Sequence, residues 1–308
     1  MNTKHVFKNP ILVIATGLLL ATNPLHAAQS RNVLDSTFTD GTRSNWFSVK
    51  PSSGNPATLT VNDTPATAID GNGLFVDQGN TFRMVVATFD TVTLANTGDY
   101  ISLSFDIRIF DSTTTATTTN ETGFPSADNA LRFGFYNANA TPVTADNTTD
   151  SNNDYGYMSL GLPFGPDTTN ITSTKFAKEA GTNSIILTGN DIPSLSASGS
   201  TGNRIHNSDT YTVTFTITKT GTGISLSSTV KDADGSTLFS VTGTDSSINN
   251  AYTSFDEIAF GSSADIGYRL DNVSVTTNVS QIPEPATSVL ITGTVILAAI
   301  VTIRRRRA

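Results

Sequence analysis

The 308-residue sequence predicts an all-β fold, either a sandwich or a barrel of antiparallel strands. In two segments, 101–109 and 211–217, apolar residues alternate with polar ones, so that one face of each strand is apolar. Between residues 30 and 280 no window shows a convincing 3.6-residue period, and 173–180 offers at best one or two helical turns. About a dozen short strands without helices are therefore expected.

Weaker strand patterns follow the same alternation, at 81–89, 130–136, 156–162, 184–188, 223–230, 237–241, 255–260 and 268–275. Residues 35–41 have the composition of a first strand and turn. Three long polar segments, 111–128, 137–154 and 190–209, are expected to be loops. The strands between residues 28 and 280 suit one large all-β domain.

Both ends of the chain carry targeting signals. Residues 1–27 combine Lys4 and Lys8 with an apolar run from Ile11 to Ala21 and small residues before the expected cut, which indicates a secretory signal peptide. Residues 281–308 contain Pro283, Glu284 and Pro285, then an uncharged run, then four arginines. A short apolar helix stopped by arginines is expected to anchor in a membrane with the arginines on the cytoplasmic side.

The stop-transfer arginines are Arg304, Arg305, Arg306 and Arg307. The Pro-Glu-Pro, apolar segment and arginine cluster, in this order, resemble the PEP-CTERM sorting tail of exported bacterial proteins. The resemblance implies recognition by an exosortase-type enzyme. It further implies an inner-membrane-anchored precursor that ends in the cell envelope or the extracellular matrix, in bacteria that secrete exopolysaccharide.

A second resemblance concerns the domain itself. Residues 269–275, Arg-Leu-Asp-Asn-Val-Ser-Val, resemble the closing strand of jelly-roll domains in the concanavalin-like and carbohydrate-binding-module groups. The expected fold is therefore a jelly-roll-type antiparallel β-sandwich, with an N-terminal signal peptide and one C-terminal transmembrane helix.

The net charge and the absence of cysteine exclude several classes of partner and site. Region 28–280 holds 12 of the 18 basic residues and 25 of the 26 acidic ones, a net charge near −13. Nucleic acid needs a basic footprint and is excluded as a partner. The chain has no cysteine, which excludes disulfides, zinc–thiolate sites and cysteine nucleophiles. A neutral glycan or divalent cations remain compatible with this charge.

Catalysis finds little support in the sequence. His206 is the only histidine after residue 27, and no Gly-x-Ser-x-Gly motif accompanies it. Glycoside hydrolysis needs two carboxylates at a defined separation. The glutamates of region 28–280 are Glu121, Glu179 and Glu257, without the Glu-x-Asp-x-x-Glu pattern of laminarinase-type enzymes. The protein is expected not to be an enzyme.

Two binding sites are predicted. Trp46, Tyr155 and Tyr157 are the candidates for stacking on sugar rings, against the alternative that they pack in the core. Asp146, Asp150, Asn152 and Asp154 offer clustered oxygens for a structural Ca²⁺, although the segment is not an EF-hand because Tyr155 replaces the loop glycine. The first functional hypothesis is glycan or exopolysaccharide binding. The second is a matrix structural or adhesion protein without a specific ligand, and the third is a glycoside-active enzyme.

Overall fold

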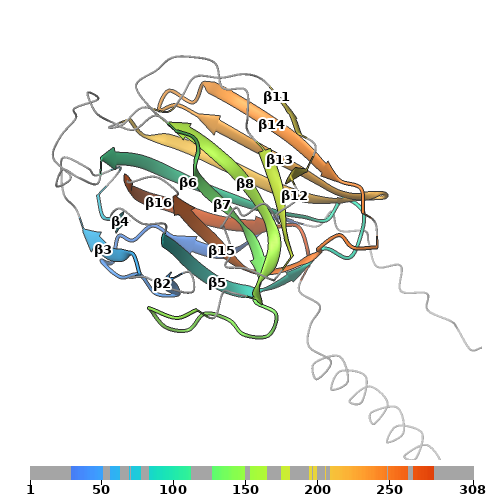
Figure 1. Ribbon diagram of the computed structural model, residues 1–308, viewed down its shortest axis with the longest axis horizontal. Helices are drawn as coiled ribbons and strands as arrows, with labels where there is room; N and C mark the ends of the chain where they lie inside the picture. The colour runs from blue at the N-terminus through green and yellow to red at the C-terminus, as the bar shows by residue number, and fades with distance from the viewer. Residues whose placement is uncertain are drawn as a thin grey trace, which may run out of the picture.

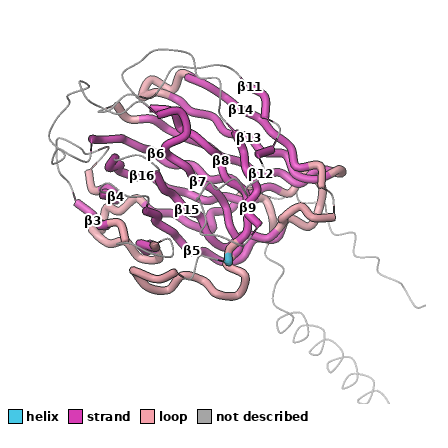
Figure 2. Tube along the Cα trace, in the orientation of Figure 1, coloured by secondary structure: helices cyan, strands magenta, loops and turns pink. Residues whose placement is uncertain are grey.

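The computed structural model describes residues 29–50, 56–62, 69, 71–77, 83–111, 127–149, 153–164, 175–180, 194–195, 197–199, 205, 209–247, 249–262 and 266–280. These residues form two antiparallel β-sheets stacked as a sandwich (Figure 1). Strands make up almost all of their regular structure (Figure 2). The predicted all-β antiparallel sandwich is confirmed. None of the described residues forms a helix long and apolar enough to span a membrane.

The larger sheet has nine strands, in the order β11-β14-β13-β12-β6-β16-β4-β3, with β1 also paired to β16. Its strands are β1 (Arg31–Ser36), β3 (Thr58–Asn62), β4 (Gly73–Asp77), β6 (Tyr100–Asp111), β11 (Ala197–Gly199), β12 (Tyr211–Thr220), β13 (Gly223–Lys231), β14 (Thr237–Asp245) and β16 (Ile266–Thr277). The last strand, β16, lies between β6 and β4 and pairs with β1, so both ends of the described chain meet in this sheet.

The smaller sheet has seven strands in the order β10-β9-β8-β7-β15-β5-β2. They are β2 (Trp46–Val49), β5 (Arg83–Thr93), β7 (Ala127–Asn137), β8 (Tyr155–Phe164), β9 (Lys175–Ala180), β10 (Ser194–Leu195) and β15 (Ser254–Ser262). The loop between β7 and β8, green in Figure 1, runs along the edge of the molecule below β5, and Thr148 forms a bridge with Val49 of β2.

The core lies between the two sheets. The apolar residues of the strongest sequence pattern, from Ile101 to Ile109 in β6, are all fully buried and point toward the smaller sheet. Aromatic rings join the layers: Phe105 of β6 lies 5.2 Å from Phe133 of β7 and 4.9 Å from Phe260 of β15, both edge to face. Fully burying one such side chain stabilises the fold by about 1.5–3 kcal/mol.

Several sequence expectations differ from the structure. The segment 173–180 was predicted at best as helical turns, but Lys175–Ala180 is strand β9, because it pairs with β8 and places Phe176 in the core. The expected loop 190–209 contains the short strands β10 and β11. The expected strand 184–188, the signal peptide 1–27 and the tail 281–308 lie outside the described residues, so the domain boundaries and the jelly-roll assignment stay predictions.

Candidate functional site

A polar pocket of about 270 Å³ opens beside the turn that connects β1 to β2. Its lining comes from a single segment of the chain, residues 34–46 without Gly41. Asp40 shapes this turn, since its carboxylate accepts bonds from the Thr42 backbone N–H at 2.9 Å and hydroxyl at 2.8 Å. The backbone bond from Thr42 is the main reason that the pKa of Asp40 is lowered.

Phe38 is held in a left-handed conformation, with φ of 55°, which costs a bulky residue about 1–3 kcal/mol. Its ring offsets this cost, because it is 4% exposed and packs 5.6 Å from the Trp46 ring. Phe38 and Trp46 therefore give the pocket an apolar floor, and the polar side chains of the segment form its wall. Such strained positions concentrate at functional sites, which makes this turn a candidate.

Trp46 forms that floor and not an exposed platform. The indole is 1% exposed, lies 5.6 Å from the Phe38 ring and 5.9 Å from the Phe260 ring, and donates from Nε1 to Ser36 Oγ at 3.0 Å. Because the indole is buried, a sugar cannot stack on Trp46, and the predicted stacking role of this residue is wrong.

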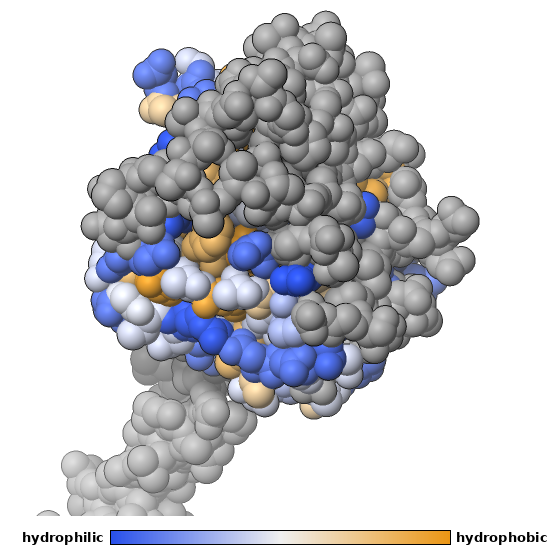
Figure 3. Space-filling view, turned by 60° about the vertical axis from the view of Figure 1, so that its left-hand side comes forward, coloured by the Kyte–Doolittle hydropathy of each residue, from blue (hydrophilic) through white to orange (hydrophobic). Residues whose placement is uncertain are grey.

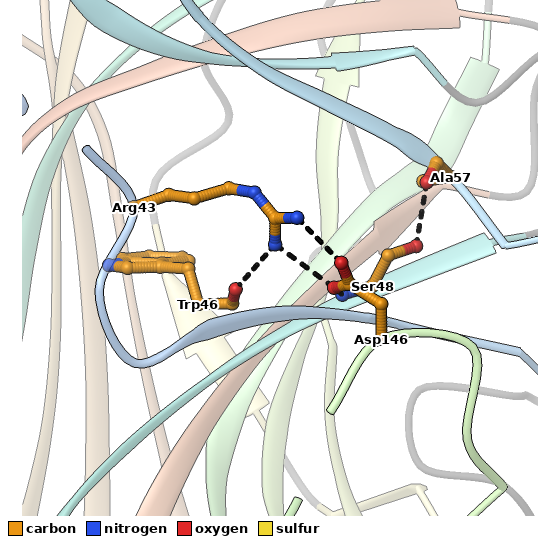
Figure 4. Close-up of polar contacts among 5 residues, drawn as sticks. All are labelled: Arg43, Trp46, Ser48, Ala57 and Asp146. Atoms are coloured by element: carbon orange, nitrogen blue, oxygen red, sulfur yellow. Dashed lines mark hydrogen bonds and ion pairs between the residues drawn. The ribbon is translucent and has the colours of Figure 1, made fainter. Parts of the chain in front are cut away.

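Arg43 connects the pocket to the β7–β8 loop (Figure 4). Its Nη1 donates to the Trp46 carbonyl at 2.8 Å and to Asp146 Oδ1 at 2.9 Å, while Nη2 donates to Asp146 Oδ2. The Ser48 backbone N–H also donates to Asp146 Oδ1 at 2.9 Å. The hydrogen bond from Arg43 is the largest cause of the lowered pKa of Asp146, and Ser48 adds to it.

This arrangement alters the predicted calcium site. Both oxygens of Asp146 face a guanidinium, which repels a cation, so Asp146 is removed from the proposed ligands. Asp150 and Asn152 lie outside the described residues, and Asp154 is fully buried. Within the described part of the chain no group of three or more acidic or histidine side chains is placed to hold a metal ion.

The loop 138–149, here called the strap, is tied down along its length. Near its start the Ala138 N–H donates to Asp256 Oδ1 at 2.8 Å, and at its centre the Val143 N–H donates to Glu257 Oε1 at 2.9 Å. Val143 is 1% exposed and belongs to an apolar cluster on the outer face of the smaller sheet. Together with the contacts of Asp146, these bonds hold the strap against the smaller sheet.

The predicted tyrosines lie elsewhere. Tyr155 and Tyr157 are on β8, four strands from β2 and Trp46, which is about 19 Å at one strand spacing each. Tyr157 is fully buried, so its predicted role in stacking on a sugar ring is also wrong. Tyr155 is partly exposed, with its ring 4.7 Å from that of Tyr252. The three aromatic residues therefore do not form one binding surface.

Two of the three glutamates lie in one row of the smaller sheet. Glu179 of β9, Gly156 of β8, Tyr136 of β7 and Glu257 of β15 occupy one row across the smaller sheet. Three strand spacings separate the backbones of Glu179 and Glu257, about 14 Å. Glu121 lies outside the described residues.

Sequence reasoning missed two groups of functional interest. No local sequence pattern indicates a role for Arg43, because its partner, Asp146, lies 103 residues away. Lys178 and Asp245 form an ion pair of 2.7 Å between the two sheets, and neither belongs to a motif. In Figure 3 the described residues on the visible face are mostly hydrophilic or intermediate in hydropathy, with small apolar areas between them.

Comparison with known proteins gives only distant similarities. No family model matches the chain, and no curated protein matches it. Among solved structures, the seed lectin of Lotus tetragonolobus is 10% identical, with 81% of this chain and 100% of that chain covered and a TM-score of 0.43. Basic winged bean lectin with Tn-antigen gives 10% identity, coverages of 81% and 98%, and a TM-score of 0.43. The carbohydrate recognition domain of Emp46p, in its metal-free form, is 12% identical, with 81% of this chain and 96% of that chain covered and a TM-score of 0.42. At these TM-scores the similarity carries no argument about this chain.

Proposed function

We propose that this protein is an exported, non-enzymatic glycan-binding module that takes one neutral sugar residue into the pocket of segment 34–46. The observation that carries the proposal is the pocket itself, a polar cavity over a buried aromatic floor. Its volume, about 270 Å³, is below the roughly 300–1,000 Å³ of sites for drug-sized ligands, which suits a single ring-sized group.

The chemistry of the wall selects a neutral, hydroxyl-bearing ligand. Thr37 and Thr39 offer hydroxyls that both donate and accept, and Asp35 and Asp40 offer carboxylate acceptors. The two carboxylates disfavour an anionic sugar. Arg43, the cation of the pocket, is already engaged by Asp146. A sugar hydroxyl therefore finds acceptors and neutral donors here, and an acid group finds repulsion.

Binding on a glycan array tests the pocket. The full-length protein, solubilised in a detergent without a sugar headgroup, is compared with Asp35→Ala and Thr37→Val, both exposed at the rim. Each change removes one or two hydrogen bonds, so binding to the neutral glycans should weaken about tenfold. Asp90→Ala, an exposed aspartate on β5, is the matched control and should bind as the wild type does. Equal binding by all variants contradicts the pocket assignment.

The sorting route is the second part of the proposal. The Pro283-Glu284-Pro285 tail and its arginine cluster support export, membrane anchoring of the precursor and handling by an exosortase-type enzyme, with the domain then held at the envelope or in the matrix. Deleting residues 282–308 should release the domain into the medium, because the apolar segment that remains after signal cleavage lies there. A truncated protein that fractionates with membranes would contradict this route.

A further inference from the structure

The outer face of the larger sheet carries a regular array of hydroxyl groups. Two adjacent rows cross the five neighbouring strands β14, β13, β12, β6 and β16, and every position in both rows is a serine or threonine. We call these ten residues the hydroxyl face. The first row is Thr242, Ser227, Thr216, Ser102 and Thr276, and the second row is Ser240, Thr229, Thr214, Ser104 and Ser274.

The hydroxyl face is accessible and uncharged. None of its ten residues is buried, while their neighbours along the strands, such as Phe215 and Leu226, fill the core. Hydroxyls recur about every 4.8 Å across the strands and about 6.8 Å along them. Some pair with each other, as Ser102 and Thr216 do at 2.7 Å, but each hydroxyl has one donor and two acceptor sites, so capacity remains for a ligand.

The second row leads into the pocket. Ser274 of β16 pairs with Asp35 of β1, and Asp35 lines the pocket. From Ser240 to Asp35 the row spans five strand spacings, about 24 Å. A chain of several sugars can lie along this row with one residue in the pocket, so the face and the pocket form one continuous surface.

We propose that the hydroxyl face binds a single neutral linear polysaccharide chain, laid across the strands and ending in the pocket. The proposal rests on the proposed function and specifies its ligand as an extended chain. The uncharged face in a region of net charge near −13 suits a neutral polymer and repels polyanions. An apolar partner is disfavoured, because it would bury ten hydroxyls without hydrogen-bond partners.

The twist of the larger sheet favours binding of a single flexible polysaccharide chain over binding of a flat, crystalline polysaccharide surface. Neighbouring strands rotate by about 20–25°, so five strands turn the face through a large angle. A planar crystalline surface contacts only part of such a face. A single chain with rotatable glycosidic linkages can follow it, and neutral hydroxyl pairs accept many local orientations.

Saccharide probes of different length distinguish binding in the pocket from binding along the hydroxyl face. The full-length protein is titrated with neutral β-glucan and mannan probes as disaccharides, hexasaccharides and soluble polymers, and with polygalacturonate as the polyanion. Wild-type affinity should rise with the length of the neutral probe and stay low for polygalacturonate. The variant Thr214→Val/Thr216→Val/Thr229→Val keeps the β-branched shape but removes three hydroxyls. It should bind the polymers about tenfold more weakly and the disaccharides unchanged.

Two control variants test whether the weaker polymer binding comes from loss of the three hydroxyl groups. Serine at the same three positions keeps the hydroxyls and should restore polymer binding. Valine at Thr58, Thr60 and Thr222, which are exposed outside the hydroxyl face, should leave it unchanged.

Each outcome decides between the two proposals. Equal affinity of the wild type for disaccharide and polymer, or an unchanged length dependence in the valine variant, overturns the face proposal and leaves the pocket intact. Polymer binding that depends on the face without any disaccharide binding overturns the pocket proposal instead. Tight polygalacturonate binding, or no binding of any neutral probe, overturns the face proposal. A dimer that dissolves in the valine variant, without length dependence, assigns the face to a second copy.

Discussion

The phenolic hydroxyl of Tyr157 donates a 2.7 Å hydrogen bond to Oδ2 of Asp245, and this bond joins β8 of the smaller sheet to β14 of the larger one. Lys178 donates to the same oxygen, also at 2.7 Å, and the Ser247 N–H donates to Oδ1 at 2.9 Å. Burial would raise the pKa of Asp245, but these bonds outweigh it and lower the pKa to about 2. Burial and the bond to Asp245 raise the pKa of Tyr157.

Asp245→Asn should lower the free energy of unfolding by about 2–3 kcal/mol. Hydrogen bonds to charged groups contribute about 1.5–3 kcal/mol each, and the change leaves the Lys178 ammonium without its carboxylate. Urea unfolding measures the effect as a shift of the midpoint at constant slope. Asp234→Asn, in the exposed β13–β14 turn, is the control and should unfold like the wild type. Equal midpoints for the two variants would show that Asp245 does not hold the sheets together.

The same pair predicts a dependence on pH. The pKa of Asp245 is about 2 in the folded protein against an ordinary value of 3.8, so its contribution is present above the ordinary value and is lost as the pH falls through about 2. The difference in unfolding free energy between the wild type and Asp245→Asn should be constant near neutral pH and shrink between about pH 4 and pH 2. A difference that stays constant down to pH 2 contradicts this assignment.

Core packing gives a contrast within two paired strands. Phe105→Ala should cost about 3–5 kcal/mol, because the ring is fully buried against Phe133 and Phe260. Thr214→Ala, on the outward face of the neighbouring strand β12, should cost less than about 1 kcal/mol. Equal urea midpoints for both variants would mean that the faces are wrongly assigned.

These strands show what a local pattern can reveal. The alternation in 101–109 and 211–217 predicts both the strands and their buried faces, because side chains of a strand alternate whatever its partner is. The face of β9 was not predictable in this way, since Lys175–Ala180 becomes a strand only through pairing with β8. β-propensity depends on such neighbours.

The candidate site was predicted less well, for a related reason. Trp46 and Tyr157 carry the residue types that suit sugar stacking, but exposure depends on which sheet covers each ring, and both are covered. Asp146 has the composition of a metal ligand, yet its environment is set by Arg43, which no local pattern connects to it. The pocket itself arises from the path of the 34–46 turn.

Close strand packing at Gly156 predicts a large effect of a small change. A Cβ at this position would lie 2.0 Å from the Phe135 carbonyl oxygen, so the strands β7 and β8 must move apart to accept it. Gly156→Ala should lower the unfolding free energy by about 1–3 kcal/mol or more. Gly221→Ala meets nothing within 4 Å and is the matched control. Thermal melting of the two variants compares them directly, and a wild-type melting temperature for Gly156→Ala would refute the close approach.

The ion pair between Arg43 and Asp146 is expected to order the strap locally and to contribute little to the unfolding free energy of the whole domain. The Arg43 and Asp146 side chains are 34% and 43% exposed, and an exposed ion pair contributes about 0–1 kcal/mol. Asp146→Asn should therefore leave the urea midpoint nearly unchanged. It should speed amide hydrogen exchange at Asn147, whose N–H donates to the Ser48 carbonyl at 2.7 Å next to the lost pair.

Exchange at a distant amide provides the reference for this experiment. The Lys219 N–H, near the end of β12 and far from the strap in sequence, donates to the Asp99 carbonyl at 2.9 Å, and its exchange rate should not change. Ca²⁺ in place of Mg²⁺, at equal ionic strength, tests the remaining predicted ligands in the same samples. If Asp146 acts as an ion-pair partner and not as a ligand, any Ca²⁺-specific rise of the melting temperature survives in Asp146→Asn and disappears in Asp150→Ala/Asp154→Ala. A Ca²⁺ shift abolished by Asp146→Asn alone, with unchanged exchange at Asn147, would return Asp146 to the metal ligands.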